Sequence, residues 1–111
     1  RFPNDDLAGN AQYWLGETFY VRGNYDEAAK IFAQAFQKYP KSTKAPDNLL
    51  KLGLSLSQTG KKQDACVTLQ QMNKRFPSAA AAMFTKVSTL LTITPACKGI
   101  PPGGINRLVT V

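Results

Sequence analysis

Few side chains in this 111-residue chain offer the chemistry of catalysis or metal binding. Histidine, the commonest general base and metal ligand, is absent. Two pairs of adjacent carboxylates, Asp5-Asp6 and Asp26-Glu27, stand where helices are expected to begin, and negative charge stabilises a helix at that end. The glycine pair at 103–104 is followed by neither Lys-Ser/Thr nor a helix start, as a phosphate-binding loop would be. The sequence therefore predicts a non-enzymatic protein with no catalytic, metal or cofactor site.

The two cysteines, Cys66 and Cys97, are the remaining reactive side chains. An even number of cysteines suggests a disulfide if the protein works in an oxidising compartment. Cys66 stands beside Ala65 in an expected helix, where a small buried side chain suits close packing. Cys97 lies beyond Pro95 and would have to fold back to bring the two Cα atoms within about 7 Å. Two unpaired thiols are the favoured interpretation, and a disulfide remains the alternative.

The apolar residues up to about position 93 recur at helical spacing, which predicts an all-α chain. Gly23 provides the permissive backbone for a turn between the first two helices. Pro46 fits the first turn of the third helix, where a missing N–H costs nothing. The helices are expected at about residues 7–21, 25–38, 44–58, 62–74 and 78–93. Their expected N-terminal caps are Asp5 or Asp6, Asn24, and Ser42 or Thr43.

The pattern repeats with a period of 37 residues. An aromatic-proline pair occurs three times at this period, as Phe2-Pro3, Tyr39-Pro40 and Phe76-Pro77. The same shift places Leu15-Gly16 on Leu52-Gly53, Gly23 on Gly60, and Ala28 on Ala65. Repetition at this length is typical of stacked helical hairpins. Because the chain opens on what looks like the end of an earlier repeat, we expect it to be a piece of a longer protein.

One unit of this repeat resembles the tetratricopeptide (TPR) motif position by position, through Leu15-Gly16, Phe19, Gly23, Ala28, Phe32, Ala35 and Pro40. In that motif the small residues stand where two helices cross closely, and the proline stops the second helix. The resemblance implies a TPR helical-hairpin solenoid of two repeats plus a C-terminal capping helix. The expected TPR domain covers residues 1–93, with repeat 1 at about 7–40, repeat 2 at about 44–77 and the capping helix at about 78–93. An irregular tail rich in proline and glycine is expected at 94–111.

The segments AQYWLGETFYVRGNYDEAAKIF, YPKSTKAPDNLLKLGLSL and RFP further resemble the C-terminal TPR domain of the Tol-Pal accessory family YbgF/CpoB, over about residues 1–87. This resemblance implies a protein–protein interaction module of the Gram-negative periplasm. Members of that family bind TolA and coordinate outer-membrane constriction with peptidoglycan synthesis in cell division, so a peptidoglycan synthase is a second expected partner. A signal peptide and a coiled coil would precede residue 1. The tail departs from the family, whose last helix is charged.

Stacked TPR hairpins place their first helices along a concave face, which is where such domains usually hold peptides. Tyr13 and Tyr20 are the aromatic residues expected to contact a partner there, because aromatic anchors are typical of binding surfaces. Trp14 either joins them or fills the core between repeats. The expected partner-binding residues are Asn10, Tyr13, Glu17, Tyr20, Asp47, Leu50, Lys51, Leu54 and Gln58.

The net charge of +7 is unevenly distributed along the chain. Residues 1–40 carry four basic and five acidic side chains, residues 41–77 carry seven and two, and residues 78–111 carry three and none. A solvated face with lysines at helix ends is the favoured explanation. Nucleic acid is not an expected partner, because no nucleic-acid-binding fingerprint accompanies the charge. An anionic polymer bound through residues 41–98 is the weakest alternative.

Two further expectations concern assembly and location. No apolar run reaches membrane-spanning length, so direct insertion into a membrane is not expected. Two repeats are fewer than the three or so that usually make a stable solenoid, which leaves apolar helix surface and a homo-oligomer open. The alternative to a partner-binding module is a structural TPR scaffold in an outer-membrane protein assembly complex.

Overall fold

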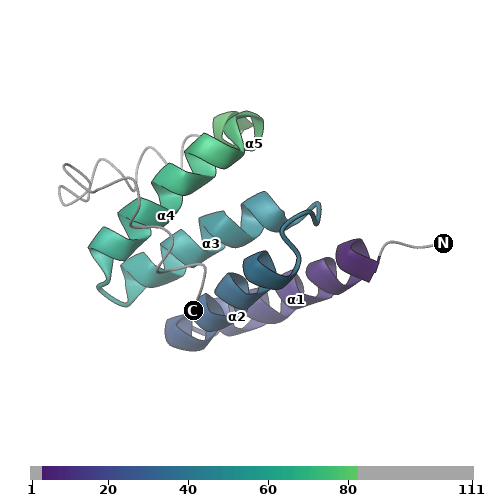
Figure 1. The fold of residues 1–111 in the computed structure, drawn as a ribbon. Helices are drawn as coiled ribbons and strands as arrows, with labels where there is room; N and C mark the ends of the chain where they lie inside the picture. The colour runs from purple at the N-terminus through teal and green to yellow at the C-terminus, as the bar shows by residue number, and fades with distance from the viewer. Residues whose placement is uncertain (1–3, 83–111) are drawn as a thin grey trace.

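The computed structural model describes residues 4–82, which form a series of antiparallel helices (Figure 1). The helices are α1 (Asn4–Val21), α2 (Tyr25–Lys38), α3 (Ala45–Gln58), α4 (Lys62–Arg75) and α5 (Pro77–Ala82). Each helix packs against the next, and α1 also contacts α3. The predicted all-α TPR solenoid is confirmed. Within the described residues, no helix is long and apolar enough to cross a membrane.

The turns at Gly23 and Gly60 are equivalent in the two hairpins and have almost the same backbone geometry. Their φ angles are +82° and +84°, in the left-handed region that favours glycine. The N–H of Asn24 donates to the carbonyl oxygen of Phe19, and the N–H of Lys61 donates to that of Leu56. The N–H of Gly23 donates to the carbonyl oxygen of Tyr20, and the N–H of Gly60 donates to that of Ser57, which completes the Schellman motif that ends each helix. The expected turn between the first two helices is therefore present, and it recurs in the second hairpin.

Small residues let the two helices of each hairpin cross closely. A Cβ atom on Gly16 would lie 2.6 Å from the Phe32 ring, and one on Gly53 would lie 2.8 Å from Leu69 Cδ2. Phe32 and Leu69 are fully buried and belong to two clusters that form the core. One cluster contains residues of α1 to α4 and the other contains residues of α2 to α4, so the core runs along the solenoid. The buried residues are Tyr13, Ala28, Phe32, Leu52, Leu56 and Ala65 in the first cluster, and Phe36, Ala45, Leu49, Leu50, Leu69 and Met72 in the second.

The prediction of which side chains cap the helices is wrong. α1 begins at Asn4, so the Asp6 side chain lies inside the helix, where Oδ1 accepts hydrogen bonds from Thr43 N–H at 3.1 Å and from Thr43 Oγ1 at 2.8 Å. These two bonds lower the pKa of the Asp6 carboxyl from its usual 3.8, the backbone bond having the larger effect. Asn24 makes no side-chain capping bond to α2, and the residue before α3 is Lys44, whose N–H donates to Ser42 Oγ.

The structure describes one of the two cysteines and only the start of the expected capping helix. Cys66 is buried and disulfide-bonded, so the favoured interpretation of two unpaired thiols is wrong for this residue. Cys97 lies outside the described residues. The expected capping helix is described only as α5, up to Ala82, and residues 83–93 and the expected tail lie outside the described part of the chain. The proposed domain limits stay a prediction.

Candidate functional site

Three aromatic side chains of α1, Tyr13, Trp14 and Tyr20, differ sharply in exposure. The Tyr13 ring is only 7% exposed and packs 5.8 Å from the Phe32 ring, centroid to centroid. Trp14 is 53% exposed and meets Tyr13 edge-on at 5.0 Å. Tyr20 is half-buried and meets Tyr25 edge-on at 5.1 Å. Of these residues, Trp14 therefore presents the most surface to a partner, whereas Tyr13 belongs mainly to the core.

Lys44, which directly precedes α3, and Lys51 within α3 both lie over these rings. Lys44 Nζ is 4.7 Å from the centroid of the Tyr13 ring and 5.3 Å from that of Trp14. Lys51 Nζ is 4.5 Å from the centroid of the Tyr20 ring. An ammonium group within about 6 Å of an aromatic face is attracted by the ring quadrupole. The aromatic residues of the first hairpin and the cations of the second thus form one continuous surface.

Lys51 also forms an ion pair with Glu17 across the same boundary. Nζ lies 3.1 Å from Glu17 Oε1 and donates a hydrogen bond to Oε2 at 3.2 Å, whereas Oε1 accepts no hydrogen bond. Both side chains are largely buried, which strengthens their attraction relative to an exposed pair. Lys44 has a longer contact of 4.0 Å with Asp47, in the first turn of α3. We refer to Tyr13, Trp14, Glu17, Tyr20, Lys44, Asp47 and Lys51 as the α1–α3 surface.

The tyrosines of this surface remain neutral at physiological pH. Burial, with smaller contributions from Glu17 and Asp47, raises the pKa of Tyr13 from 10.0 to about 12. Burial also raises the pKa of Tyr20, with smaller contributions from Tyr25 and Glu17. Because neither phenol ionises near neutral pH, the fixed charges of the surface come from the two lysines and the two carboxylates.

Five of the nine residues expected to bind a partner lie together on the α1–α3 surface: Tyr13, Glu17, Tyr20, Asp47 and Lys51. Leu50 is 4% exposed and packs in the core with Phe36 and Met72, and half-buried Leu54 packs against the same cluster. These leucines therefore contribute chiefly to stability. Asn10 and Gln58 are exposed.

Sequence reasoning did not assign Lys44 to this surface and left Trp14 undecided. Lys44 directly precedes α3 and stands seven residues, about two helical turns, before Lys51, so the two side chains are expected on the same side of α3. That spacing was the signal that could have identified Lys44.

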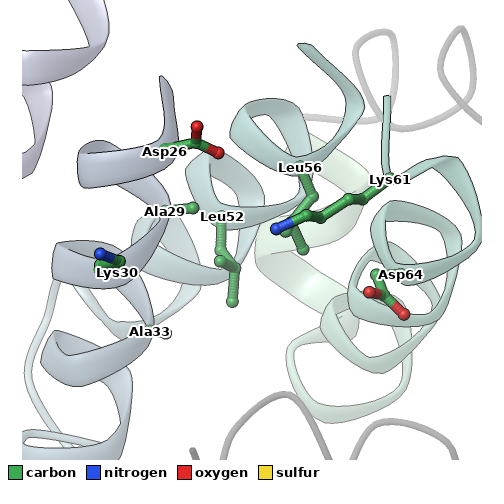
Figure 2. A pocket seen from close by; sticks show the side chains of 8 residues that line it. All are labelled: Asp26, Ala29, Lys30, Ala33, Leu52, Leu56, Lys61 and Asp64. Atoms are coloured by element: carbon green, nitrogen blue, oxygen red, sulfur yellow. The ribbon is translucent and has the colours of Figure 1, made fainter. Parts of the chain in front are cut away.

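A groove between α2 and α4 was also missed (Figure 2). Its volume is about 500 Å³, which is within the range of ligand-binding cavities. Leucines of α3 and alanines of α2 form its apolar wall, and charged side chains from α2 and the start of α4 surround it. No regular spacing connects residues from three helices, so the sequence offered no signal for it. The groove is lined by Asp26, Ala29, Lys30, Ala33, Leu52, Leu56, Lys61 and Asp64.

Comparison with protein-family models finds a tetratricopeptide repeat at residues 10–42 and again at residues 47–79. Comparisons with curated proteins and with solved structures find no match. The narrower resemblance to the YbgF/CpoB family gains no support from these comparisons and stays a prediction. The first matched segment contains α2 and most of α1, and the second contains α4 and most of α3, so each corresponds to one hairpin. Because the two matches together cover more than half of the sequence, this chain belongs to the tetratricopeptide repeat family.

Proposed function

We propose that this chain is a non-enzymatic module that binds a segment of another protein on the α1–α3 surface. Tetratricopeptide repeats form scaffolds for protein interactions, and peptides are usually held on the face lined by the first helix of each hairpin. Here those first helices are α1 and α3. The observation that carries the proposal is the half-exposed indole of Trp14 beside Lys44, because tryptophan is among the residues that contribute most to protein interfaces.

The charges of the α1–α3 surface suggest what the bound segment would offer. Lys51 is already paired with Glu17, whereas Lys44 is separated from Asp47 by 4.0 Å and retains donor capacity. A segment with an apolar side chain against Trp14 and a carboxylate near Lys44 would satisfy both groups. Glu17 and Asp47 would disfavour a second carboxylate close to them and so help to fix the register of the segment.

We further propose TolA as the partner and the periplasm of a Gram-negative bacterium as the compartment. The support for both is the sequence resemblance to the YbgF/CpoB family, whose members link outer-membrane constriction to peptidoglycan synthesis at cell division. A peptidoglycan synthase is the second partner that this resemblance suggests.

Calorimetric titration of the chain with purified TolA segments at two salt concentrations tests this proposal. We expect saturable binding that persists at the higher salt concentration, because the apolar contact with Trp14 is not screened. Trp14→Ala should weaken binding about 30-fold, and Lys44→Ala should weaken it less. Lys62→Ala, which removes an exposed lysine from α4, is the matched control and should bind like the wild type. Tyr13→Ala is unsuitable, because it would open a cavity beside Phe32.

Each other outcome identifies the part of the proposal that is wrong. Wild-type affinity in both Trp14→Ala and Lys44→Ala would place the TolA site elsewhere on the chain. No heat of binding from a chain that is folded by circular dichroism would rule out TolA and favour the structural scaffold. Loss of all binding at the higher salt concentration would favour electrostatic attachment over the Trp14 contact.

A further inference from the structure

The side of α1 that faces away from the core carries three large apolar side chains in a line. Leu7 is 66% exposed, Trp14 53% and Val21 71%. Residues seven apart on a helix lie almost above one another, since seven residues make nearly two turns. We call these three residues the α1 stripe. Leu15, which is 48% exposed, lies beside it. Among the described residues, the exposed large hydrophobic side chains are Leu7, Trp14, Leu15 and Val21.

The second repeat shows that the stripe is not a general requirement of the hairpin. A shift of 37 residues places Leu7, Trp14 and Val21 on Lys44, Lys51 and Gln58 of the second repeat. In that repeat the three equivalent side chains are polar, and the two lysines lie over aromatic rings of α1. The contact between the hairpins is therefore made without apolar residues at these positions. Positions 44 and 51 thus contact the preceding hairpin through lysines, whereas the equivalent positions on α1 carry apolar side chains that are more than half exposed.

The stripe is symmetric about its central residue. Trp14 lies seven residues from Leu7 and seven from Val21, so a two-fold axis through Trp14 exchanges the ends. An antiparallel α1 from a second copy would then place each Leu7 against the other Val21, and the two Trp14 rings together. Such a self-complementary patch is what an isologous dimer requires.

The charges of α1 also favour this direction of pairing. Glu17 is the single charged residue between Leu7 and Val21, and it is already paired with Lys51, so no unpaired charge would be buried. Asp6 marks one end of the stripe and Arg22 the other. Antiparallel pairing brings the acidic end of each stripe to the basic end of the other, whereas parallel pairing would bring like ends together. It also aligns the two helix dipoles favourably.

We propose that a second copy of this chain packs on the α1 stripe, with the two α1 helices antiparallel about a two-fold axis at Trp14. The exposed parts of the stripe residues and Leu15 offer on the order of 400 Å² of apolar surface per copy, judged from typical side-chain areas. Both copies together thus offer less than the roughly 1,200 Å² at the lower end of specific interfaces, before the flanking residues are counted. The dimer is accordingly weak, and it forms at micromolar or higher concentrations of the chain.

Sedimentation velocity over a range from about 1 µM to about 1 mM, which brackets a weak dissociation constant, tests the dimer. The mean mass should rise from 12.1 kDa towards twice that value. Trp14 is the only tryptophan, so its fluorescence emission should shift to shorter wavelength over the same concentrations as the ring leaves water. Leu7→Lys and Val21→Glu should each weaken association at least tenfold. Gln63→Lys, at an exposed position of α4, is the matched control and should leave it unchanged.

The double variant Leu7→Lys/Val21→Glu tests the antiparallel direction. In an antiparallel pair the introduced lysine of each copy faces the introduced glutamate of the other, so the double variant should associate more tightly than either single variant. Circular dichroism establishes that all variants remain folded, as their exposed positions lead us to expect.

Three results would overturn the proposal. The first is a wild-type chain that stays at 12.1 kDa throughout, in which case the stripe is covered by a different partner or by none. The second is a dimer that neither shifts the Trp14 emission nor responds to Leu7→Lys, because its interface would lie elsewhere. The third is a double variant weaker than both single variants, which would exclude antiparallel pairing. None of these measurements requires the binding partner, so the dimer is tested separately from the proposed function, although both use Trp14 and a bound partner would compete with the second copy for it.

Discussion

Lys51 and Glu17 join the two hairpins by an ion pair that is largely shielded from water, with Nζ 3.1 Å from Oε1. The same ammonium group lies over the Tyr20 ring, so a single side chain of α3 satisfies both a carboxylate and an aromatic face of α1. Because α1 and α3 otherwise make few contacts with each other, this pair is a principal direct connection between the first helices of the two repeats.

Removal of one member of this pair should cost more than removal of both. We expect Lys51→Met to lower the free energy of unfolding by about 1–3 kcal/mol, because Glu17 would remain largely buried without a cation. The double variant Lys51→Met/Glu17→Gln should recover part of that loss. Urea denaturation of the four proteins that make up this cycle measures both effects. A loss in the double variant equal to the sum of the losses in Lys51→Met and Glu17→Gln would show that the pair has no coupling energy.

Gly16 should tolerate no side chain, because its Cβ would lie 2.6 Å from the Phe32 ring. We expect Gly16→Ala to lower the free energy of unfolding by about 1–3 kcal/mol, the usual cost of overpacking, although alanine is the better helix former. Asn10→Ala, at an exposed position of the same helix, is the control and should change stability by less than about 0.5 kcal/mol. Thermal unfolding followed by circular dichroism distinguishes the two. A Gly16→Ala variant as stable as the wild type would mean that Phe32 moves aside freely.

Ser55 offers a route to a more stable chain. Its hydroxyl oxygen is buried and has no hydrogen-bond partner. Ser55→Ala removes the unsatisfied group and keeps nearly the same volume, so the free energy of unfolding should rise by up to about 1 kcal/mol. Ser57→Ala, at a partly exposed position of α3, is the matched control and should have little effect. A loss of stability in Ser55→Ala beyond that of the control would reveal a bond made by the hydroxyl.

Alkaline pH should destabilise the chain through Tyr13. The pKa of this phenol is about 12 in the folded chain and close to its usual 10.0 in the unfolded chain. A raised pKa in the folded state means that the contribution to stability is complete below pH 10 and is lost as the pH rises from 10 towards 12. We expect a loss of about 1–2 kcal/mol over this interval. Urea denaturation at several pH values should show a shallower decline for Tyr13→Phe, and identical slopes would contradict the assignment.

The fold could be predicted well from the sequence because local signals dominate it. Helices such as α2 have unambiguous apolar spacing, and the left-handed turns at Gly23 and Gly60 stand at the helix ends. The caps could not be predicted in the same way. Asp6 has the chemistry of a cap, but its carboxylate accepts hydrogen bonds from Thr43 instead, and a contact across 37 residues leaves no local trace in the sequence.

The candidate site was harder to predict than the fold. Tyr13 and Trp14 are neighbours on one helix, and their side chains point about 100° apart, so a small rotation of α1 decides which is buried. That rotation is set by the close crossing at Gly16 against Phe32, which is a tertiary feature. Leu50 presented a similar problem, because α3 has apolar residues on two sides and the sequence alone does not tell which side meets the core.

The hydrogen bonds from Thr43 to Asp6 have a geometric consequence for the whole solenoid. The two residues are separated by one repeat period, so Asp6 is bonded to its own counterpart in the next unit. The bonds therefore join the corner at the start of α1 directly to the corner that leads into α3. A change in the angle between the two hairpins would either keep these bonds and turn about this corner, or break them.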